Sequence, residues 1–183
     1  CALPISRQDH RLHMRCRQPR QGGHAGRDIL GRVPPLHRDM QRGIELEPVA
    51  RSAIARRLGV VVRETGFLAH NNLRIGSSLD GDIDDFRAVV ELKCPKTTTH
   101  LRYIEANVVP DTYMGQALHN LYVSGADTLF FGSFDDRLPA HLQLFVKEVH
   151  AKDMPLEEYD RDLREFLKQL EGRIEALATP HTN

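Results

Sequence analysis

One short stretch limits the fold of this chain more than any other: residues 77–96 read SSLDGDIDDFRAVVELKCPK. Its second half, AVVELKC at 88–94, is a short and nearly continuous apolar run, which is typical of a central strand. A glutamate and a lysine stand inside this run, at Glu91 and Lys93, and four aspartates precede it. Two metal-binding interpretations compete for so much acid beside a buried strand.

The chain from residue 43 onward alternates between helical and strand patterns. We expect helices over residues 43–59, 111–125 and 155–177, and strands over 60–70, 73–80, 88–94, 127–134 and 141–150. Asn71-Asn72 is a turn signal, so the first two strands should form a hairpin. This order of elements indicates one sheet with helices on its faces.

Apolar residues at helical spacing mark the face that each helix should bury. In the first helix, where Pro48 suits the first turn, these residues are Leu46, Val49, Ala50, Ala53, Ile54 and Leu58. The closing helix should bury Leu156, Tyr159, Leu163, Phe166, Leu167, Leu170 and Ile174.

Size and composition are those of a single globular domain. The 183 residues are 40% apolar and 27% charged, and no apolar run approaches the roughly 20 residues of a membrane span. Three cysteines without a CxxC spacing indicate neither a disulfide framework nor a zinc knuckle. We therefore expect a cytoplasmic protein, of a bacterium or a phage-infected host, with no membrane partner.

Residues 1–42 differ from the remainder. They hold nine arginines and three aspartates without lysine or glutamate, a balance of +6, whereas residues 43–183 carry 16 bases and 22 acids, a balance of −6. The first segment is either a basic, disordered arm or a non-native beginning, such as a shifted reading frame produces. Residues 43–183 form the predicted domain.

The first metal-binding interpretation is a calcium loop. Asp80, Asp82, Asp84 and Glu91 fall at positions 1, 3, 5 and 12, as in an EF-hand. However, Asp85 occupies the position where that loop needs glycine, and the flanking segments read as strands rather than helices. The EF-hand is therefore disfavoured.

The second interpretation uses only Asp80, Glu91 and Lys93. Side chains alternate along a strand, so Glu91 and Lys93 should share one face while Leu92 points into the core. If the two strands are neighbours, both carboxylates can converge on one cation, and the Leu92 carbonyl can add a third oxygen. Hard oxygen ligands suit Mg²⁺, with Mn²⁺ as a substitute. A lysine beside such a metal suits phosphodiester hydrolysis.

At these residues the sequence resembles the PD-(D/E)xK nucleases, and within them the lambda-exonuclease-like (YqaJ-type) viral recombinases. The blocks that carry the likeness are GIELEPVAR, GFLAHNNLRIGSSLDGDID, VVELKCPK and PDTYMGQALHNLYVSGAD. They cover roughly Gly43 to Asp153, and Leu79 stands where the family usually has proline. The resemblance implies an α/β, restriction-endonuclease-like core, in which a mixed β-sheet is flanked by α-helices.

The resemblance also implies a set of site residues. Asp80 and Glu91 would bind the metal with support from Glu47, and Lys93 would be the catalytic lysine. Gln116 would stand beside them, and its helix places Tyr113 and Asn120 on the same face, where either solvent or the edge of the DNA site is expected. Candidates for weaker phosphate contacts, or for solvated surface, are Lys96, His100 and Arg102.

The activity implied by the family is Mg²⁺-dependent 5′→3′ exonuclease action on linear double-stranded DNA in phage-type recombination. Its implied partners are a single-strand annealing protein and further copies of the chain in a ring. Two alternatives stay open: an endonuclease or repair nuclease with the same site, and a non-catalytic DNA- or calcium-binding module.

Overall fold

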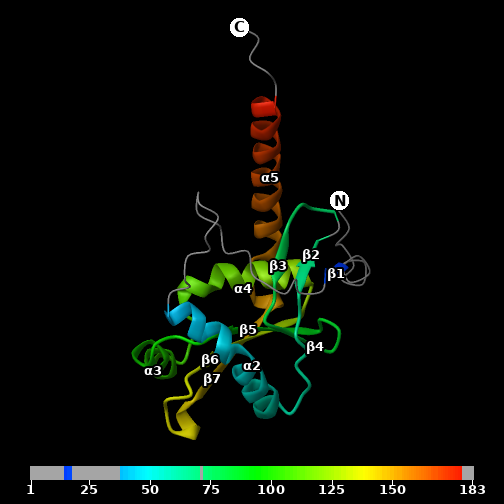
Figure 1. The fold of residues 1–183 in the computed structure, drawn as a ribbon. Helices are drawn as coiled ribbons and strands as arrows, with labels where there is room; N and C mark the ends of the chain where they lie inside the picture. The colour runs from blue at the N-terminus through cyan, green and yellow to red at the C-terminus, as the bar shows by residue number, and fades with distance from the viewer. Residues whose placement is uncertain (1–14, 18–37, 71, 179–183) are drawn as a thin grey trace.

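A computed structural model of the chain describes residues 15–17, 38–70 and 72–178 (Figure 1). The helices are α2 (Arg38–Leu58), α3 (Thr97–Ala106), α4 (Asp111–Ser124) and α5 (Leu156–Ala178), with short 3-10 helices at Ala140–Leu142 and Ala151–Asp153. One antiparallel sheet holds β1 (Arg15–Arg17), β2 (Phe67–Ala69) and β3 (Gly76–Ser78). The main sheet holds β4 (Gly81–Ile83), β5 (Ala88–Lys93), β6 (Thr128–Phe134) and β7 (Leu144–His150).

The main sheet is mixed. Strands β4 and β5 pair antiparallel, β5 and β6 pair parallel, and β6 and β7 pair antiparallel. Helices α3 and α4 lie in the crossover between the parallel strands β5 and β6. The predicted α/β fold with a mixed sheet is confirmed, but the expected hairpin of β2 and β3 belongs to a second, smaller sheet, because the chain changes sheets at Leu79 and Asp80.

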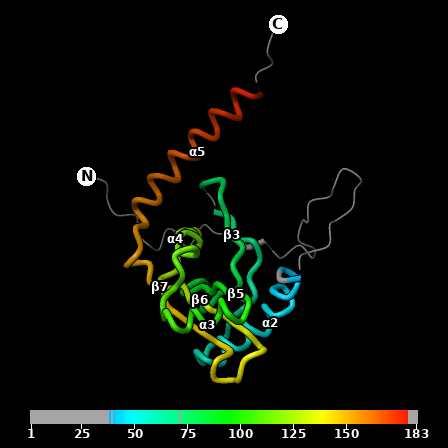
Figure 2. Tube along the Cα trace, turned by 90° about the vertical axis from the view of Figure 1, so that its left-hand side faces the viewer, coloured from blue at the N-terminus to red at the C-terminus, as the bar shows by residue number. Residues whose placement is uncertain are grey.

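Helices cover both faces of the main sheet (Figures 1 and 2). On one face Val89 and Phe131 pack with residues of α4, and on the other Val90 and Leu92 pack with residues of α2. Strand β5 is therefore buried on both faces, as its apolar run predicts.

Helix α2 begins at Arg38, five residues earlier than expected, so Pro48 lies in its interior instead of its first turn. Ser52 Oγ donates to the Pro48 carbonyl at 2.9 Å. Ala50 and Ile54 are fully buried, whereas Val49 is 47% exposed and does not belong to the buried face. The apolar stripe of α2 is thus narrower than the sequence indicates.

Gly132 on β6 lies close to side chains of α2 and β5. A Cβ at this position would lie 2.8 Å from Leu92 Cδ2 and 3.4 Å from Ile54 Cδ1. We expect Gly132→Ala to lower the free energy of unfolding by about 1–3 kcal/mol, because the packed core must shift. Gly172→Ala is the control, because Gly172 lies on α5 and no atom is within 4 Å of the new Cβ. Its free energy of unfolding should instead rise by about 0.5–1 kcal/mol. Urea titration measures both, and equal effects would contradict tight packing at Gly132.

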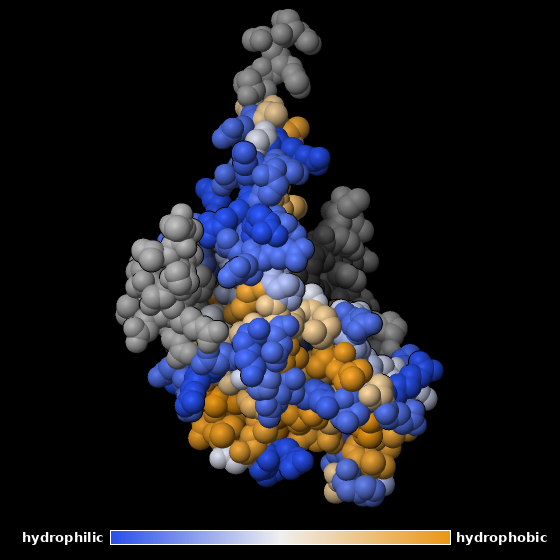
Figure 3. Space-filling view, turned by 180° about the vertical axis from the view of Figure 1, so that it is seen from behind, coloured by the Kyte–Doolittle hydropathy of each residue, from blue (hydrophilic) through white to orange (hydrophobic). Residues whose placement is uncertain are grey.

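Helix α5 projects from the body (Figures 1 and 2), and Figure 3 shows the projecting part as mostly hydrophilic. Near its start, Tyr159 and Leu163 pack against the core on the α4 side. Further along, Phe166, Leu170 and Ile174 are 59%, 41% and 53% exposed. The expectation that the whole apolar stripe is buried is therefore wrong, because the body of the domain does not extend along the helix. None of the described helices is long and apolar enough to cross a membrane.

Candidate active site

Asp80 and Glu91 come together at the start of β4. Gly81 pairs with Val90 across the antiparallel ladder, which places Asp80 beside the end of β5. Asp80 Oδ2 accepts a hydrogen bond from the Leu92 N–H at 2.7 Å. The side chain of Asp80 thus replaces a backbone acceptor where the strand pairing stops.

Glu91 is 2% exposed and both of its carboxylate oxygens have partners. Oε1 accepts from Lys93 Nζ and from Gln116 Nε2, the latter at 2.7 Å. Oε2 accepts from Asn120 Nδ2 at 2.8 Å. One ammonium and two amides therefore hold this buried charge in a single orientation.

The polar face of α4 lies over β5. Asn120 is fully buried, so the solvent alternative for this residue is wrong. Ser77 Oγ donates to Asn120 Oδ1 at 2.5 Å, which directs the Asn120 amide N–H group toward Glu91. Gln116 is one turn away on the same face and is more exposed.

Lys93 shares a face with Glu91, as strand alternation predicts, and forms an ion pair with it. Its Nζ lies 5.1 Å from the centroid of the Tyr113 ring. Tyr113 itself packs on the rings of Phe131 and Tyr103. The structure therefore places Tyr113 against the lysine, where a cation–π contact can fix the ammonium.

Glu47 reaches the same site from α2 through Arg51, a residue that the sequence reasoning missed. Arg51 forms an ion pair with Glu47 one turn earlier and donates from Nε to the Asp80 carbonyl at 2.6 Å. Arg51 also contacts Glu64 at 3.4 Å. The i,i+4 spacing of Glu47 and Arg51 was the signal that could have identified it.

The site holds several carboxylates in a poorly solvated space. Burial raises the pKa of Asp80, and burial followed by the charge of Asp80 raises that of Glu91. Burial and then Asp80 also raise the pKa of Glu47, whereas Arg51 lowers it. Such crowding destabilises the ionised groups and favours a cation among them.

The donor chemistry fits a hard divalent cation. In the described part of the chain, no three His, Cys, Asp or Glu side chains are already grouped as a metal site. Asp80 and Glu91 nevertheless offer carboxylate oxygens, and the Leu92 carbonyl points to the same side of β5 as its N–H, toward Asp80. Glu47 is the third carboxylate, and it forms an ion pair with Arg51. These residues could hold a hard divalent cation.

The other aspartates do not join this site. Asp82 is 5% exposed and pairs with Arg63 at 2.6 Å, and Arg63 also pairs with Asp85 at 2.6 Å. Asp84, Asp85 and Phe86 form a left-handed turn between β4 and β5, with φ values of 51°, 52° and 65°. Strands flank this turn, which confirms the rejection of the EF-hand.

The residues after β5 have different environments. Lys96 and Arg102 are exposed, at the start and within α3. His100 is fully buried, with Nδ1 2.7 Å from Ser133 Oγ and Nε2 2.8 Å from the Leu142 carbonyl. His100 is therefore a core residue, and both expectations for it, a phosphate contact or solvated surface, are wrong.

Replacing Asn120 by alanine should weaken both the site and the fold. Glu91 Oε2 and Ser77 Oγ would each lose a buried partner, so we expect the free energy of unfolding to fall by about 1–3 kcal/mol. Gln116→Ala is the matched control, because Lys93 still contacts the oxygen that Gln116 leaves. Thermal unfolding of both variants checks that Asn120→Ala loses more stability than Gln116→Ala. An equal or larger loss of stability in Gln116→Ala would contradict the prediction.

Comparison with known proteins shows what the chain is similar to. Residues 27–127 match the family described as the YqaJ-like viral recombinase domain. An alkaline exonuclease (LHK-Exo) from Laribacter hongkongensis is 34% identical, with a TM-score of 0.72 over 79% of this chain and 75% of that chain. Its complex with dAMP gives 33% identity and a TM-score of 0.72 over 81% and 76%.

A phage-related exonuclease from Haemophilus somnus 129PT shares the fold at 13% identity, with a TM-score of 0.59 over 82% of this chain and 79% of that chain. Among curated proteins, none matches the sequence.

Proposed function

Because this chain belongs to the YqaJ-like viral recombinase family, we propose that it is a metal-dependent exonuclease acting on linear double-stranded DNA. The family resemblance seen in the sequence is thereby confirmed, and the similarity to an alkaline exonuclease supports a nuclease. The single observation that carries the proposal is Glu91, a buried carboxylate held between Lys93 and two amides, beside Asp80. Burying a charged carboxylate lowers the stability of the fold. A carboxylate that is buried and held in this way is therefore more typical of a catalytic site than of a structural one.

In the proposed mechanism each residue has one task. Glu91 and Asp80 would hold Mg²⁺, with Mn²⁺ as a substitute, and Glu47 would complete or support its ligand shell. When bound, the metal would supply a more acidic water and charge neutralisation at phosphorus. As an ammonium, Lys93 would orient the attacking water and stabilise negative charge as it develops on the phosphate oxygens. The alternative is that Lys93, as a neutral amine, takes the proton of this water.

The surrounding residues hold the side chains of Glu91, Asp80 and Lys93 in place. Gln116 and Asn120 prevent Glu91 from rotating, and the Leu92 N–H fixes Asp80. Tyr113 limits the movement of the Lys93 ammonium. Catalytic groups fixed in advance need little reorganisation when the reaction takes place.

We extend the proposal to the family's mode of action. Strand removal would run 5′→3′ in phage-type recombination, with a single-strand annealing protein as partner and a ring of identical chains around the DNA. Family membership supports these features. DNA labelled at either the 5′ or the 3′ end tests the polarity, and light scattering of the purified chain tests the oligomer.

The test of the activity is release of acid-soluble nucleotides from linear, 5′-phosphorylated duplex DNA with Mg²⁺, with and without a chelator. A covalently closed circle of the same sequence is the control. We expect release from the linear DNA alone, lost with the chelator. Cleavage of the circle would indicate the endonuclease or repair nuclease instead, and DNA binding without any release would indicate a non-catalytic module.

A further inference from the structure

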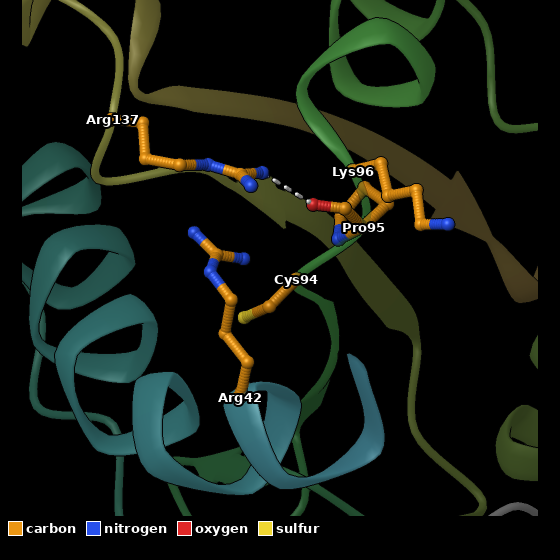
Figure 4. Close-up of a pocket in the computed structure, with 5 residues that line it drawn as sticks. All are labelled: Arg42, Cys94, Pro95, Lys96 and Arg137. Carbon is orange, nitrogen blue, oxygen red and sulfur yellow. Dashed lines mark hydrogen bonds between the residues drawn. The ribbon is translucent and has the colours of Figure 1, made fainter. Parts of the chain in front are cut away.

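A cavity of about 230 Å³ opens immediately beyond the catalytic strand. Its lining residues are Arg42, Cys94, Pro95, Lys96 and Arg137 (Figure 4). Cys94 follows Lys93 directly in the chain, so this cavity begins one residue past the proposed catalytic lysine. Figure 4 shows the two guanidinium groups, from α2 and from the segment after β6, on the same side of the cavity as the Cys94 side chain.

A buried carboxylate holds these two arginines. Asp135 has no exposed side-chain surface and pairs with Arg42 at 2.9 Å and with Arg137 at 2.7 Å. Burial raises the pKa of Asp135, but hydrogen bonds, first of all from Arg137, outweigh this and keep the pKa well below its usual range. The lowered pKa favours the ionised form of Asp135, which holds two like charges close together.

Both arginine side chains keep exposed surface beside their contacts. Arg42 also pairs with Asp136 at 2.5 Å, and Arg137 Nη2 donates to the Pro95 carbonyl at 3.3 Å. The side chain of Arg42 remains 25% exposed and that of Arg137 47% exposed. Lys96 also lines the cavity, and its ammonium points away from the two guanidinium groups (Figure 4). The acids whose charges act on the lining residues are Asp135, Asp136, Glu47 and Asp80. Three of the five residues that line the cavity are therefore cationic, and none of the five is acidic.

We propose that this cavity, which we call the Arg42–Arg137 pocket, binds an internal phosphate of the DNA backbone one or two nucleotides from the scissile bond. The proposal rests on the proposed function. A guanidinium has planar, paired donors that match a phosphate, and here a buried carboxylate orients two of them in advance. Residues one to three positions past Lys93 lie about 3–10 Å further along an extended chain, and successive phosphates are spaced about 3.4 Å along the duplex axis.

The test measures binding of a fluorescent duplex by anisotropy at several salt concentrations, in a Lys93→Ala background that prevents hydrolysis. Arg42→Gln and Arg137→Gln should each weaken binding about tenfold, as expected for a lost charged hydrogen bond. Each should also lower the magnitude of the salt slope by about one. Arg42→Lys should keep the slope, because the charge remains.

Arg173→Gln, on the projecting α5, is the control and should leave affinity and slope unchanged. Far-UV circular dichroism checks the fold of each variant. If Arg137→Gln does not fold, Lys96→Gln tests the pocket from an exposed position and should likewise lower the slope. Duplexes with a 5′-phosphate and with a 5′-hydroxyl are compared, and a backbone phosphate predicts equal losses on both.

Two results would overturn the pocket while leaving the proposed function intact. In the first, the wild-type chain degrades DNA, but the folded Arg42→Gln and Arg137→Gln variants bind DNA with the same affinity and salt slope as the Lys93→Ala parent. In the other, the loss is confined to 5′-phosphorylated DNA, which would assign the pocket to the strand end. A wild-type chain that neither binds nor degrades DNA would instead overturn the proposed function, and the pocket with it.

Discussion

Replacing Lys93 by alanine is expected to slow DNA hydrolysis by about 1,000-fold or more, with little change in the fold. Its ammonium lies between Glu91 and the Tyr113 ring, where it can stabilise charge that develops on the phosphate. The side chain is 24% exposed, so its removal leaves no large buried cavity. Single-turnover hydrolysis of linear duplex DNA with Mg²⁺ measures the effect on the chemical step.

Lys168→Ala is the matched control, because Lys168 is exposed on α5. This variant should hydrolyse DNA at the wild-type rate. Equilibrium binding of DNA to Lys93→Ala separates a catalytic role from a binding role, since only the rate should change greatly. A Lys93→Ala variant that cuts within a few-fold of the wild-type rate would show that the site is wrongly assigned.

Replacing Asp80 by asparagine should abolish hydrolysis and, in the presence of a chelator, stabilise the fold. Burial raises the pKa of Asp80 above its unfolded value, so above that unfolded value the ionised form destabilises the folded state. At neutral pH this penalty is present in the wild type and absent in the variant. Asparagine can still accept the hydrogen bond from the Leu92 N–H. We therefore expect the free energy of unfolding of the variant to be higher than that of the wild type.

Thermal unfolding without metal measures the gain, and isothermal titration with Mg²⁺ measures the loss of metal binding. Asp162→Asn, exposed on α5, is the control and should alter neither quantity. An Asp80→Asn variant that keeps its activity would remove Asp80 from the metal site. A variant that is less stable than the wild type would show that attraction to Lys93 and Arg51 exceeds the penalty of burial.

The local patterns of the sequence predicted much of the fold. The apolar run of β5 gave a strand buried on both faces, and its alternation placed Glu91 and Lys93 on one side. The predicted end of the 111–125 helix is confirmed at Gly125, which has a left-handed φ of 64° and whose N–H donates to the Leu121 carbonyl. These features depend on residues near in sequence, and periodicity reports on such neighbours directly.

Features that depend on distant segments were harder to predict. Nothing near Asn120 in the sequence shows that its polar face meets the buried Glu91, 29 residues earlier. Helix α3 was missed because it begins with three threonines, which are poor helix formers, and because its fully buried side chain is His100, while its apolar residues Tyr103 and Ile104 are only partly buried. The apolar stripe of α5 runs past the end of the body, whose extent no helical pattern can show.

The parallel pairing of β5 with β6 also affects how the site forms during folding. Asp80 and Glu91 are brought together by a short hairpin, which closes on the microsecond timescale. Gln116 and Asn120 can reach Glu91 only after the crossover of residues 94–127 has closed onto the sheet, a non-local step that is slower. Until then the Glu91 carboxylate has no amide partner from α4, so hydrogen-exchange protection of α4 should develop together with catalytic competence and later than that of the β4–β5 hairpin.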